Sequence, residues 1–381
     1  MSEWHIRFGT AGTSDSFEAK GYKSSLDIPA YTAEMGLDAF EYQCGHGVRL
    51  GVDKAGKMAA DAAERGILFS VHAPYYISMS SLEEEKRLGS VRYLLQSAEV
   101  CRALGGKRII FHSGSCGKQS REAALEKALD TMRRAVEALD EAGYGDMTLC
   151  PETMGKIGQL GTLDEVLALC GVDKRIMPCI DFGHLNARTL GGIQSRADYA
   201  AILDRMDEVL GDERARRFHV HFSRIEFSAG GEKRHWTFAE TQFGPEPQPL
   251  MELLAERRLE PVIICESAGT QAEDAQAMQR MYEAARGYPL SYKASPFGRG
   301  VTAGDGEGKP GAIEPPHTDG QKPWSKRCCR SVDKSLSTSL PSQALRASSP
   351  KGRAFNSFIP HFLSFSSSFL PKPLAKWRGI G

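Results

Sequence analysis

Side chains that bind metal ions recur at the ends of short hydrophobic runs in this 381-residue sequence. Six runs end in His, Asp or Glu; one reads LFSVH and ends at His72, and another reads VIICE and ends at Glu266. Imidazole nitrogens and carboxylate oxygens are the usual zinc ligands, and carboxylate-rich sites also suit manganese or iron. The pattern therefore predicts metal-dependent chemistry. With two further histidines from the following loops, the candidate ligands are His72, His112, Glu152, Asp181, His184, His221, His235 and Glu266.

The number of candidates indicates a cluster of two or three ions, because one ordinary zinc ion takes four ligands. A single His or Glu at a strand end is more often structural. However, Glu152, Asp181 and Glu266 all follow hydrophobic runs, and a carboxylate buried without a cation or donor costs several kcal/mol, on the order given for uncompensated charges. His219 and His221 lie two residues apart on one run and face the same side. We expect His219 to lie one layer deeper, as a supporting or core residue.

Eight hydrophobic runs, beginning with residues 6–9 and 37–44, alternate with segments of helical spacing. Such alternation indicates βαβ units and a parallel sheet. Eight units predict an α/β fold, a closed (β/α)8 TIM barrel, in which the strand ends converge on the face that carries the active site. The expected helices span residues 54–65, 83–104, 121–142, 162–170, 198–210, 249–257 and 272–285.

Charge and composition divide the chain into a catalytic domain, residues 1–288, and a tail, residues 289–381. The first part contains 34 Lys and Arg against 43 Asp and Glu, whereas the tail contains 14 against 5. The tail is rich in Ser, Pro, Gly and Lys without a sustained period, so we expect it to be disordered. Its alternatives are a basic arm that assists nucleic-acid binding and an artefactual extension of the reading frame. The acidic first part is unlike a generic nucleic-acid binder.

No hydrophobic stretch reaches the roughly 18 to 20 residues that a membrane span requires, and no signal peptide follows the first residues. We therefore expect a soluble, cytoplasmic monomer without a membrane partner. The nine cysteines contain no C-x-x-C pair and fit reduced thiols better than a disulfide framework. Cys328 and Cys329 are adjacent and lack the spacing of a zinc finger.

The strand ends also carry motifs that resemble those of the endonuclease IV family of apurinic/apyrimidinic DNA-repair enzymes. The resemblance covers residues 5–287, and its most specific part is the Asp-x-x-His-x-Asn motif from Asp181 to Asn186. The other motifs are VHAPY at 71–75, FHSG at 111–114, PET at 151–153, HFS at 221–223 and CES at 265–267.

The resemblance implies a TIM-barrel hydrolase with a trinuclear zinc (Zn2+) cluster, with Mn2+ as an alternative ion. By resemblance, His72 and His112 hold one ion, Glu152 bridges it to a second ion held by Asp181, His221 and Glu266, and His184 and His235 hold the third. Glu152 and Glu266 are then the catalytic residues, and Glu266 steers the nucleophilic water. The implied substrate is double-stranded DNA with abasic sites, cut 5′ to the lesion during base excision repair. Tyr75 is expected to pack beside the opened abasic site, and Arg49 to approach DNA.

One position departs from the family pattern. The third ion normally has an Asp two residues before the final His, where this chain has Lys233. A protonated lysine offers no lone pair to a metal. Either Glu232 replaces it, or the third site is weak or empty.

The alternative function is that of a xylose-isomerase-like sugar isomerase or epimerase. Such enzymes use one divalent ion, held here by Glu152, Asp181, His221 and Glu266, and the two glutamates move a proton beside a sugar carbonyl. The acidic charge of residues 1–288 favours this alternative, whereas the outer histidines favour the nuclease. A barrel without enzymatic activity would leave the convergent carboxylates unexplained.

Overall fold

The computed structural model describes residues 5–287; the expected boundary at residue 288 and the whole tail, including Cys328 and Cys329, lie outside the described residues. Eight parallel strands form one sheet in the order β5-β4-β3-β2-β1-β10-β7-β6. The strands are β1 (Arg7–Ala11), β2 (Ala39–Gln43), β3 (Leu68–His72), β4 (Arg108–Phe111), β5 (Thr148–Pro151), β6 (Cys179–Asp181), β7 (His219–Phe222) and β10 (Val262–Cys265).

The sheet curves into a nearly closed barrel, and its two end strands, β5 and β6, meet. Glu152 and Cys179 form an isolated parallel bridge there. Beside it, the Thr153 amide donates a hydrogen bond of 3.0 Å to the Cys179 carbonyl. The predicted (β/α)8 TIM barrel is therefore confirmed.

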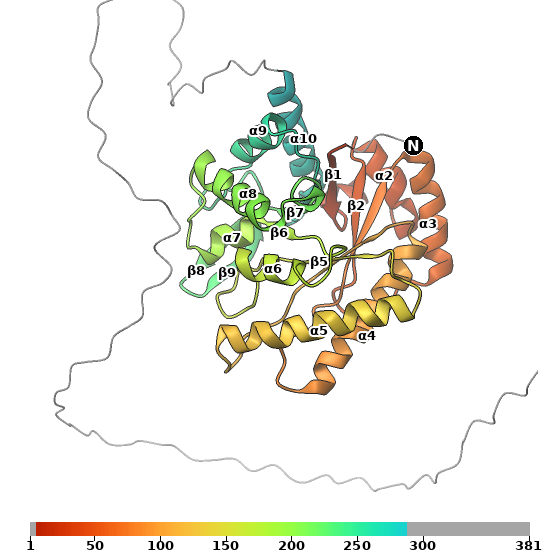
Figure 1. Ribbon diagram of the computed structural model, residues 1–381. Coiled ribbons are helices and arrows are strands. Elements are labelled where there is room, and N and C mark those ends of the chain that lie inside the picture. Colours follow the sequence, from red (N-terminus) through yellow and green to blue (C-terminus); the bar gives the residue numbers. More distant parts are fainter. Residues whose placement is uncertain (1–4, 288–381) are drawn as a thin grey trace, which may run out of the picture. The chain divides into compact units, whose positions relative to one another are not determined.

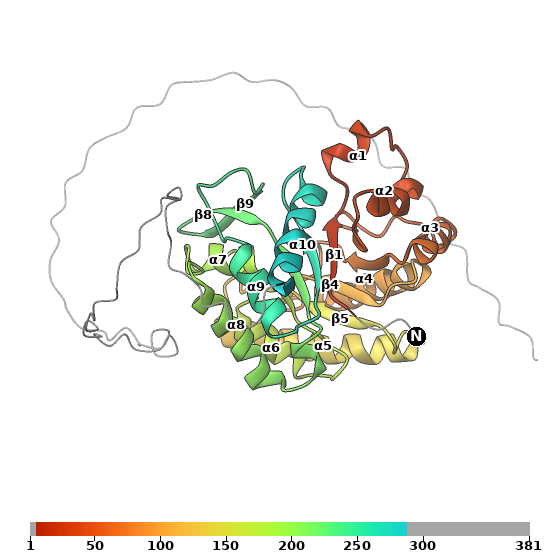
Figure 2. The same ribbon diagram turned by 90° about the horizontal axis from the view of Figure 1, so that it is seen from above.

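Helices alternate with the strands and surround the barrel (Figures 1 and 2). The buried residues of the long helix α5 (Arg121–Glu141), including Ala124, Ala128, Met132 and Ala135, recur three or four residues apart, so one stripe of the helix packs into the main hydrophobic core. The predicted helices are confirmed as α3 (Val52–Arg65), α4 (Glu84–Ala103), α5 (Arg121–Glu141), α6 (Leu163–Cys170), α8 (Arg196–Leu210), α9 (Gln248–Glu256) and α10 (Gln271–Gly287).

Several short elements were not predicted, because each has too few residues to show a period. They are α1 (Asp15–Ala19), η1 (Ser25–Asp27), α2 (Ile28–Glu34), α7 (Phe182–Arg188), η2 (Glu213–Ala215) and the antiparallel pair β8 (Arg224–Ser228) and β9 (Gly231–Trp236). The expectation that His184 lies in a loop was wrong, since it lies in the first turn of α7. Likewise, His235 lies on β9 rather than in an irregular loop.

The polar residues inside the barrel differ along its axis: those near the start of the strands make structural hydrogen bonds, and those at the carboxyl ends are the candidate metal ligands. At the start of β4, the buried Arg108 guanidinium donates to the carbonyls of Arg217 at 2.7 Å and Phe218 at 3.1 Å. Glu41 lies in the middle of β2 and is fully buried. The predicted ligands follow at the carboxyl ends of the strands. The fold thus places the polar side chains on the face where TIM barrels carry their active sites.

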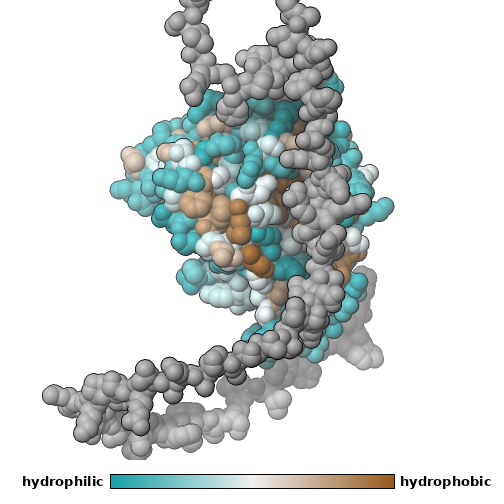
Figure 3. Space-filling model, turned by 90° about the vertical axis from the view of Figure 1, so that its left-hand side faces the viewer, coloured by the Kyte–Doolittle hydropathy of each residue, from teal (hydrophilic) through white to brown (hydrophobic). Residues whose placement is uncertain are grey.

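The face that carries β8 and β9 is mostly hydrophilic and has one narrow hydrophobic band (Figure 3). Between residues 5 and 287, no helix is both long enough and apolar enough to cross a membrane. The seven cysteines in this part of the chain are free and buried, as expected for reduced thiols.

Glu165 anchors α6 and provides a test of the fold. The predicted capping box is confirmed, since Thr162 and Glu165 bond to each other's backbone amides. The Glu165 carboxylate also accepts hydrogen bonds from Arg121 at 2.7 and 2.8 Å and from the Gly161 amide at 2.8 Å. Burial raises the pKa of Glu165, but these donors outweigh burial and hold the pKa below its ordinary value.

A lowered pKa in the folded state means that ionised Glu165 stabilises the fold at neutral pH, and that this contribution is lost as the pH falls from the ordinary carboxyl range through the folded value. We expect Glu165→Gln to lower the free energy of unfolding of the metal-free protein by about 1–3 kcal/mol at pH 7. The difference should shrink in acid. Urea denaturation at pH 7 and pH 4 measures both values, and a difference that does not depend on pH would contradict this role.

Candidate metal centre

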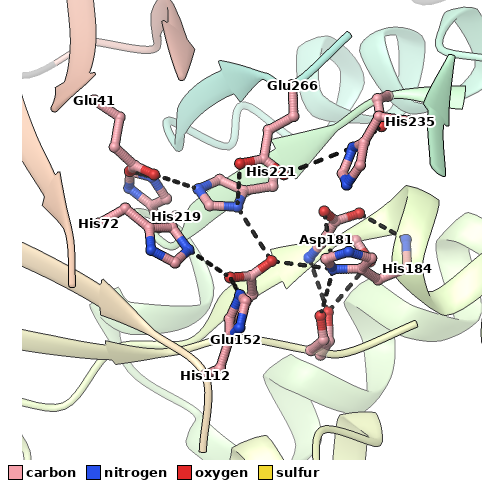
Figure 4. Close-up of polar contacts among 12 residues, drawn as sticks. Glu41, His72, His112, Glu152, Asp181, His184, His219, His221, His235 and Glu266 are labelled. Carbon is pink, nitrogen blue, oxygen red and sulfur yellow. Dashed lines mark hydrogen bonds and ion pairs between the residues drawn. The ribbon is translucent and has the colours of Figure 1, made fainter. Parts of the chain in front are cut away.

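The eight predicted ligands converge at the carboxyl ends of the barrel strands (Figure 4). Together with Glu232 they form three groups, in each of which the ligand atoms lie within 4.8 Å of one another. The first group is His72, His112 and Glu152; the second is Glu152, Asp181, His221 and Glu266; the third is His184, Glu232 and His235. Since Glu152 belongs to both the first and the second group, these two share a carboxylate.

Glu152 lies at the centre of this arrangement, directly after β5, and is fully buried. One carboxylate oxygen, Oε2, is 3.2 Å from His72 Nε2 and 3.3 Å from His112 Nε2. The other, Oε1, is 3.0 Å from His184 Nδ1 and 3.3 Å from His221 Nδ1. Burial alone would raise the pKa of Glu152, but the charges of His221 and His112 and the hydrogen bonds from the histidines hold it well below the ordinary value. The carboxylate is therefore ionised and faces both groups.

Three of the histidines are fixed through one ring nitrogen. His72 Nδ1 lies 2.9 Å from the carbonyl of the next residue, and His184 Nδ1 lies 3.0 Å from the Thr153 carbonyl. His235 Nδ1 lies 2.8 Å from the Ser223 hydroxyl. An imidazole that donates through one nitrogen presents the lone pair of the other, which is the usual arrangement of metal-binding histidines. His72 Nε2 thus faces the first group, and His184 Nε2 faces the third group.

Asp181 has two oxygens in different situations. Oδ1 caps α7 by accepting a hydrogen bond of 2.7 Å from the His184 amide. Oδ2 is buried and lies 3.1 Å from His184 Nδ1, but this contact lacks the geometry of a hydrogen bond. Burial raises the pKa of Asp181 to about 6, with His184 opposing the rise and Glu266 adding to it. A buried oxygen without a donor is costly, and a cation in the second group would compensate it.

Without metal, protons on the histidines balance the carboxylates. Burial lowers the pKa of His184, but the charges of Asp181 and Glu152 raise it to about 10. Burial likewise opposes the neighbouring charges at His221, whose pKa is nevertheless raised well above its ordinary value. Because a metal ion binds neutral imidazole, an ion entering these groups displaces protons. The donor set therefore fits divalent cations.

A β-bulge in β9 determines which side chains reach the third group. In the pairing of β8 with β9, Glu226 lies opposite Arg234 and Phe227 lies opposite Glu232. Lys233 is therefore an extra residue without a partner on β8. An extra residue shifts the alternation of a strand by one position.

The shifted alternation puts Glu232 and His235, three residues apart, on the same side of the hairpin. The Glu232 carboxylate lies 3.4 Å from His184 Nε2, and its side chain is 14% exposed. Lys233 instead pairs with Glu226, and its side chain is 53% exposed. The lysine thus stays out of the third group, and Glu232 supplies the carboxylate.

A sequence model described as "Xylose isomerase-like TIM barrel" matches residues 29–285. The chain belongs to this family. Uncharacterized protein MJ0133 of Methanocaldococcus jannaschii is 35% identical to it over 260 residues, which cover 68% of this chain and 91% of that protein. Probable endonuclease 4 of Shouchella clausii is 32% identical over 184 residues, which cover 46% of this chain and 59% of that protein.

The chain is similar in fold to solved structures of an endonuclease and of a sugar epimerase-like protein. Endonuclease IV from Thermus thermophilus has a TM-score of 0.52 and 22% identity, and the match covers 73% of this chain and 98% of that chain. A D-tagatose 3-epimerase-like protein has a TM-score of 0.57 and 19% identity, with 74% and 98% covered. At these identities the likeness shows the shared fold alone.

Tyr75 and Arg49, the two residues predicted to contact DNA, are both exposed. Tyr75 lies beside the first group, with its ring centroid 5.5 Å from that of His112 and its residue 55% exposed. Gly45 allows this position, since a Cβ there would lie 2.6 Å from the tyrosine ring. Arg49 is exposed in the segment after β2, and its contact with DNA stays a prediction.

One buried residue was missed by sequence reasoning. Glu41 lies on β2, and its carboxylate oxygens are 3.0 Å from His219 Nε2 and 3.0 Å from His221 Nε2. Burial lowers the pKa of His219 to about 4, so this histidine is neutral. The structure places His219 beneath His221 as expected. The sequence feature that could have identified Glu41 is a single carboxylate within a hydrophobic strand.

The bulge leads to a prediction about metal content. Glu232→Gln should remove one ion per chain, because a neutral amide replaces the only carboxylate of the third group. Lys233→Ala should retain the full content, since the lysine faces outward. Elemental analysis of both variants after removal of free metal measures the difference. If both variants bind as many ions as the unaltered protein, Glu232 is not a ligand.

Proposed function

We propose that this chain is a zinc-dependent phosphodiesterase that cleaves DNA 5′ to apurinic/apyrimidinic sites, as its similarity to probable endonuclease 4 proteins suggests. The observation that carries the proposal is the presence of three ligand groups, of which the first and the second share Glu152. A single-ion sugar isomerase needs only the second group. The first and third groups have no role in that reaction, but they fit a phosphodiesterase.

Ions bound in the three groups would lower the pKa of a water molecule, orient the phosphate and stabilise the charge on the attacking and leaving oxygens. Glu152 holds the first and second groups together. Glu266 is more accessible than the fully buried Glu152 and Asp181, with 15% of its side chain exposed. One of its oxygens is 3.5 Å from His221 Nδ1 and the other is 3.9 Å from His235 Nδ1. This position between two groups suits a carboxylate that orients the attacking water.

Binding of the substrate would use the rim of the barrel. Tyr75 is an exposed aromatic side chain beside the first group and can pack against the sugar or base next to an abasic site. Arg49 can approach a DNA phosphate. Since residues 1–288 have 43 acidic against 34 basic side chains, attraction of the phosphate depends on bound cations. Affinity for DNA should therefore depend strongly on metal loading.

A sugar isomerase or epimerase is the second candidate, because the second group alone forms a complete four-ligand site. Glu152 and Glu266 would then transfer a proton beside a sugar carbonyl. In that case the first and third groups would stay without metal.

The proposal is tested with a short DNA duplex that carries one stable abasic analogue. We expect the folded, zinc-loaded protein to nick the strand on the 5′ side of the lesion, and a chelator to prevent the reaction. The same duplex without the lesion is the control. Absence of metal-dependent nicking would contradict the repair function, and epimerisation of a ketohexose by the same preparation would favour the second candidate.

A further inference from the structure

Glu41 connects the buried part of the barrel to the second group, and no function proposed so far uses it. We propose that Glu41 is a positioning residue that keeps a proton on His221 Nε2, so that the Nδ1 lone pair of His221 faces the metal ion. The inference rests on the proposed metal centre, because it assigns His221 as a ligand.

The two nitrogens of His221 face opposite sides of its ring. Nδ1 lies 3.3 Å from Glu152 Oε1 and 3.5 Å from Glu266 Oε1, within the second group. Nε2 lies 3.0 Å from Glu41 Oε1, on the buried side (Figure 4). Nδ1 is therefore the nitrogen within the second group, and the carboxylate within reach of Nε2 is Glu41.

Glu41 is held by more donors than its contact with His221. The Ser70 hydroxyl donates to Oε2 at 2.9 Å, and the Gln43 amide donates to Oε1 at 3.3 Å. His219 Nε2 lies 3.0 Å from Oε2. Glu41 and Ser70 are paired residues of neighbouring strands, so the backbone fixes their distance. The carboxylate is thereby fixed in one orientation under His221.

His221 differs in this respect from His72, whose Nδ1 faces a neutral backbone carbonyl. His184 Nδ1 lies 3.0 Å from the Thr153 carbonyl and 3.0 Å from Glu152 Oε1, so its carboxylate partner belongs to the metal centre itself. A carboxylate behind a metal-bound imidazole fixes its proton and makes the ring a stronger ligand, and loss of such a partner typically costs about 10–100-fold in metal affinity. Glu41 should therefore strengthen the second group selectively.

An alternative to the inferred role of Glu41 is the binding of an additional ion deeper in the barrel. The ligand atoms of Cys179, His219 and His221 also lie within 4.8 Å of one another. An ion there that used His221 Nε2 would displace the proton that faces Glu41. The ring would then bind two ions through both nitrogens, which the contact with Glu41 disfavours.

The test compares Glu41→Gln with the unaltered protein by zinc titration against a chelator. Glutamine keeps the size of the side chain, but it removes the charge and turns an amide NH2 toward one of the donors. We expect one bound ion to lose about 10–100-fold in affinity while the others keep theirs. Glu137→Gln, which makes the same change at an exposed position of α5 outside the metal centre, is the matched control and should leave all affinities unchanged.

A second readout needs no variant. In zinc-loaded protein with 15N-labelled histidine, His221 should bind through Nδ1 and show a slowly exchanging Nε2 proton. Equal zinc affinity of Glu41→Gln and unaltered protein, or binding of the ion through Nε2, would overturn the inference. So would an ion that disappears in Cys179→Ala, because it would place metal in the deeper site. If the unaltered protein binds no zinc, the proposed metal centre itself fails.

Discussion

Glu152→Gln should lower metal-dependent turnover by at least about 1,000-fold, equivalent to about 4 kcal/mol of transition-state stabilisation. The carboxylate lies within 3.3 Å of four histidines and is shared by the first and second groups. An uncharged amide cannot balance two neighbouring cations, so both groups should lose affinity for metal. The variant should also unfold at a different temperature, because it changes a fully buried charge.

Turnover on the abasic duplex and metal content together measure this effect. Glu137→Gln, at an exposed position of α5, is the matched control and should behave as the unaltered protein. Near-normal turnover by Glu152→Gln would remove this carboxylate from the reaction. Because a sugar isomerase would also depend on Glu152, the variant tests the site and not the choice of substrate.

His112→Ala distinguishes the nuclease from the sugar isomerase, which Glu152→Gln cannot do. It removes one of three ligands from the first group and leaves the second group complete. We expect incision of abasic DNA to fall by at least about 100-fold, or about 3 kcal/mol, through loss of the first ion. A sugar isomerase would lose little activity, since its single ion would lie in the second group.

The matched control for this variant is His5→Ala. His5 is an exposed histidine that precedes β1 and pairs with Asp38. The loss of incision should be accompanied by the loss of one ion from His112→Ala and none from His5→Ala. If His112→Ala incised abasic DNA at the normal rate, the assignment of the first ion would be wrong.

The barrel could be predicted because its strands are buried on both faces. Such strands appear in the sequence as continuous hydrophobic runs, and their parallel order makes their last residues converge. This argument reached His72, His112, Glu152, His221 and Glu266 without knowledge of distances. The capping box at the start of α6 was also local enough to be recognised.

Features that depend on pairing between distant segments could not be predicted. The role of Glu41 depends on a contact across the barrel interior between β2 and β7, which are far apart in the sequence and are separated in the sheet by β1 and β10. The bulge that turns Lys233 outward is visible only in the register of β8 and β9. The short helix α7 was missed for a local reason, because sequence reasoning had considered its capping residue, Asp181, only as a ligand.

The metal content of the purified protein tests the central claim most directly. Three ligand groups, two of which share Glu152, predict three zinc ions per chain after removal of free metal. Elemental analysis against an accurate protein concentration gives this number. A single ion per chain would contradict the cluster and favour a sugar isomerase with metal in the second group alone.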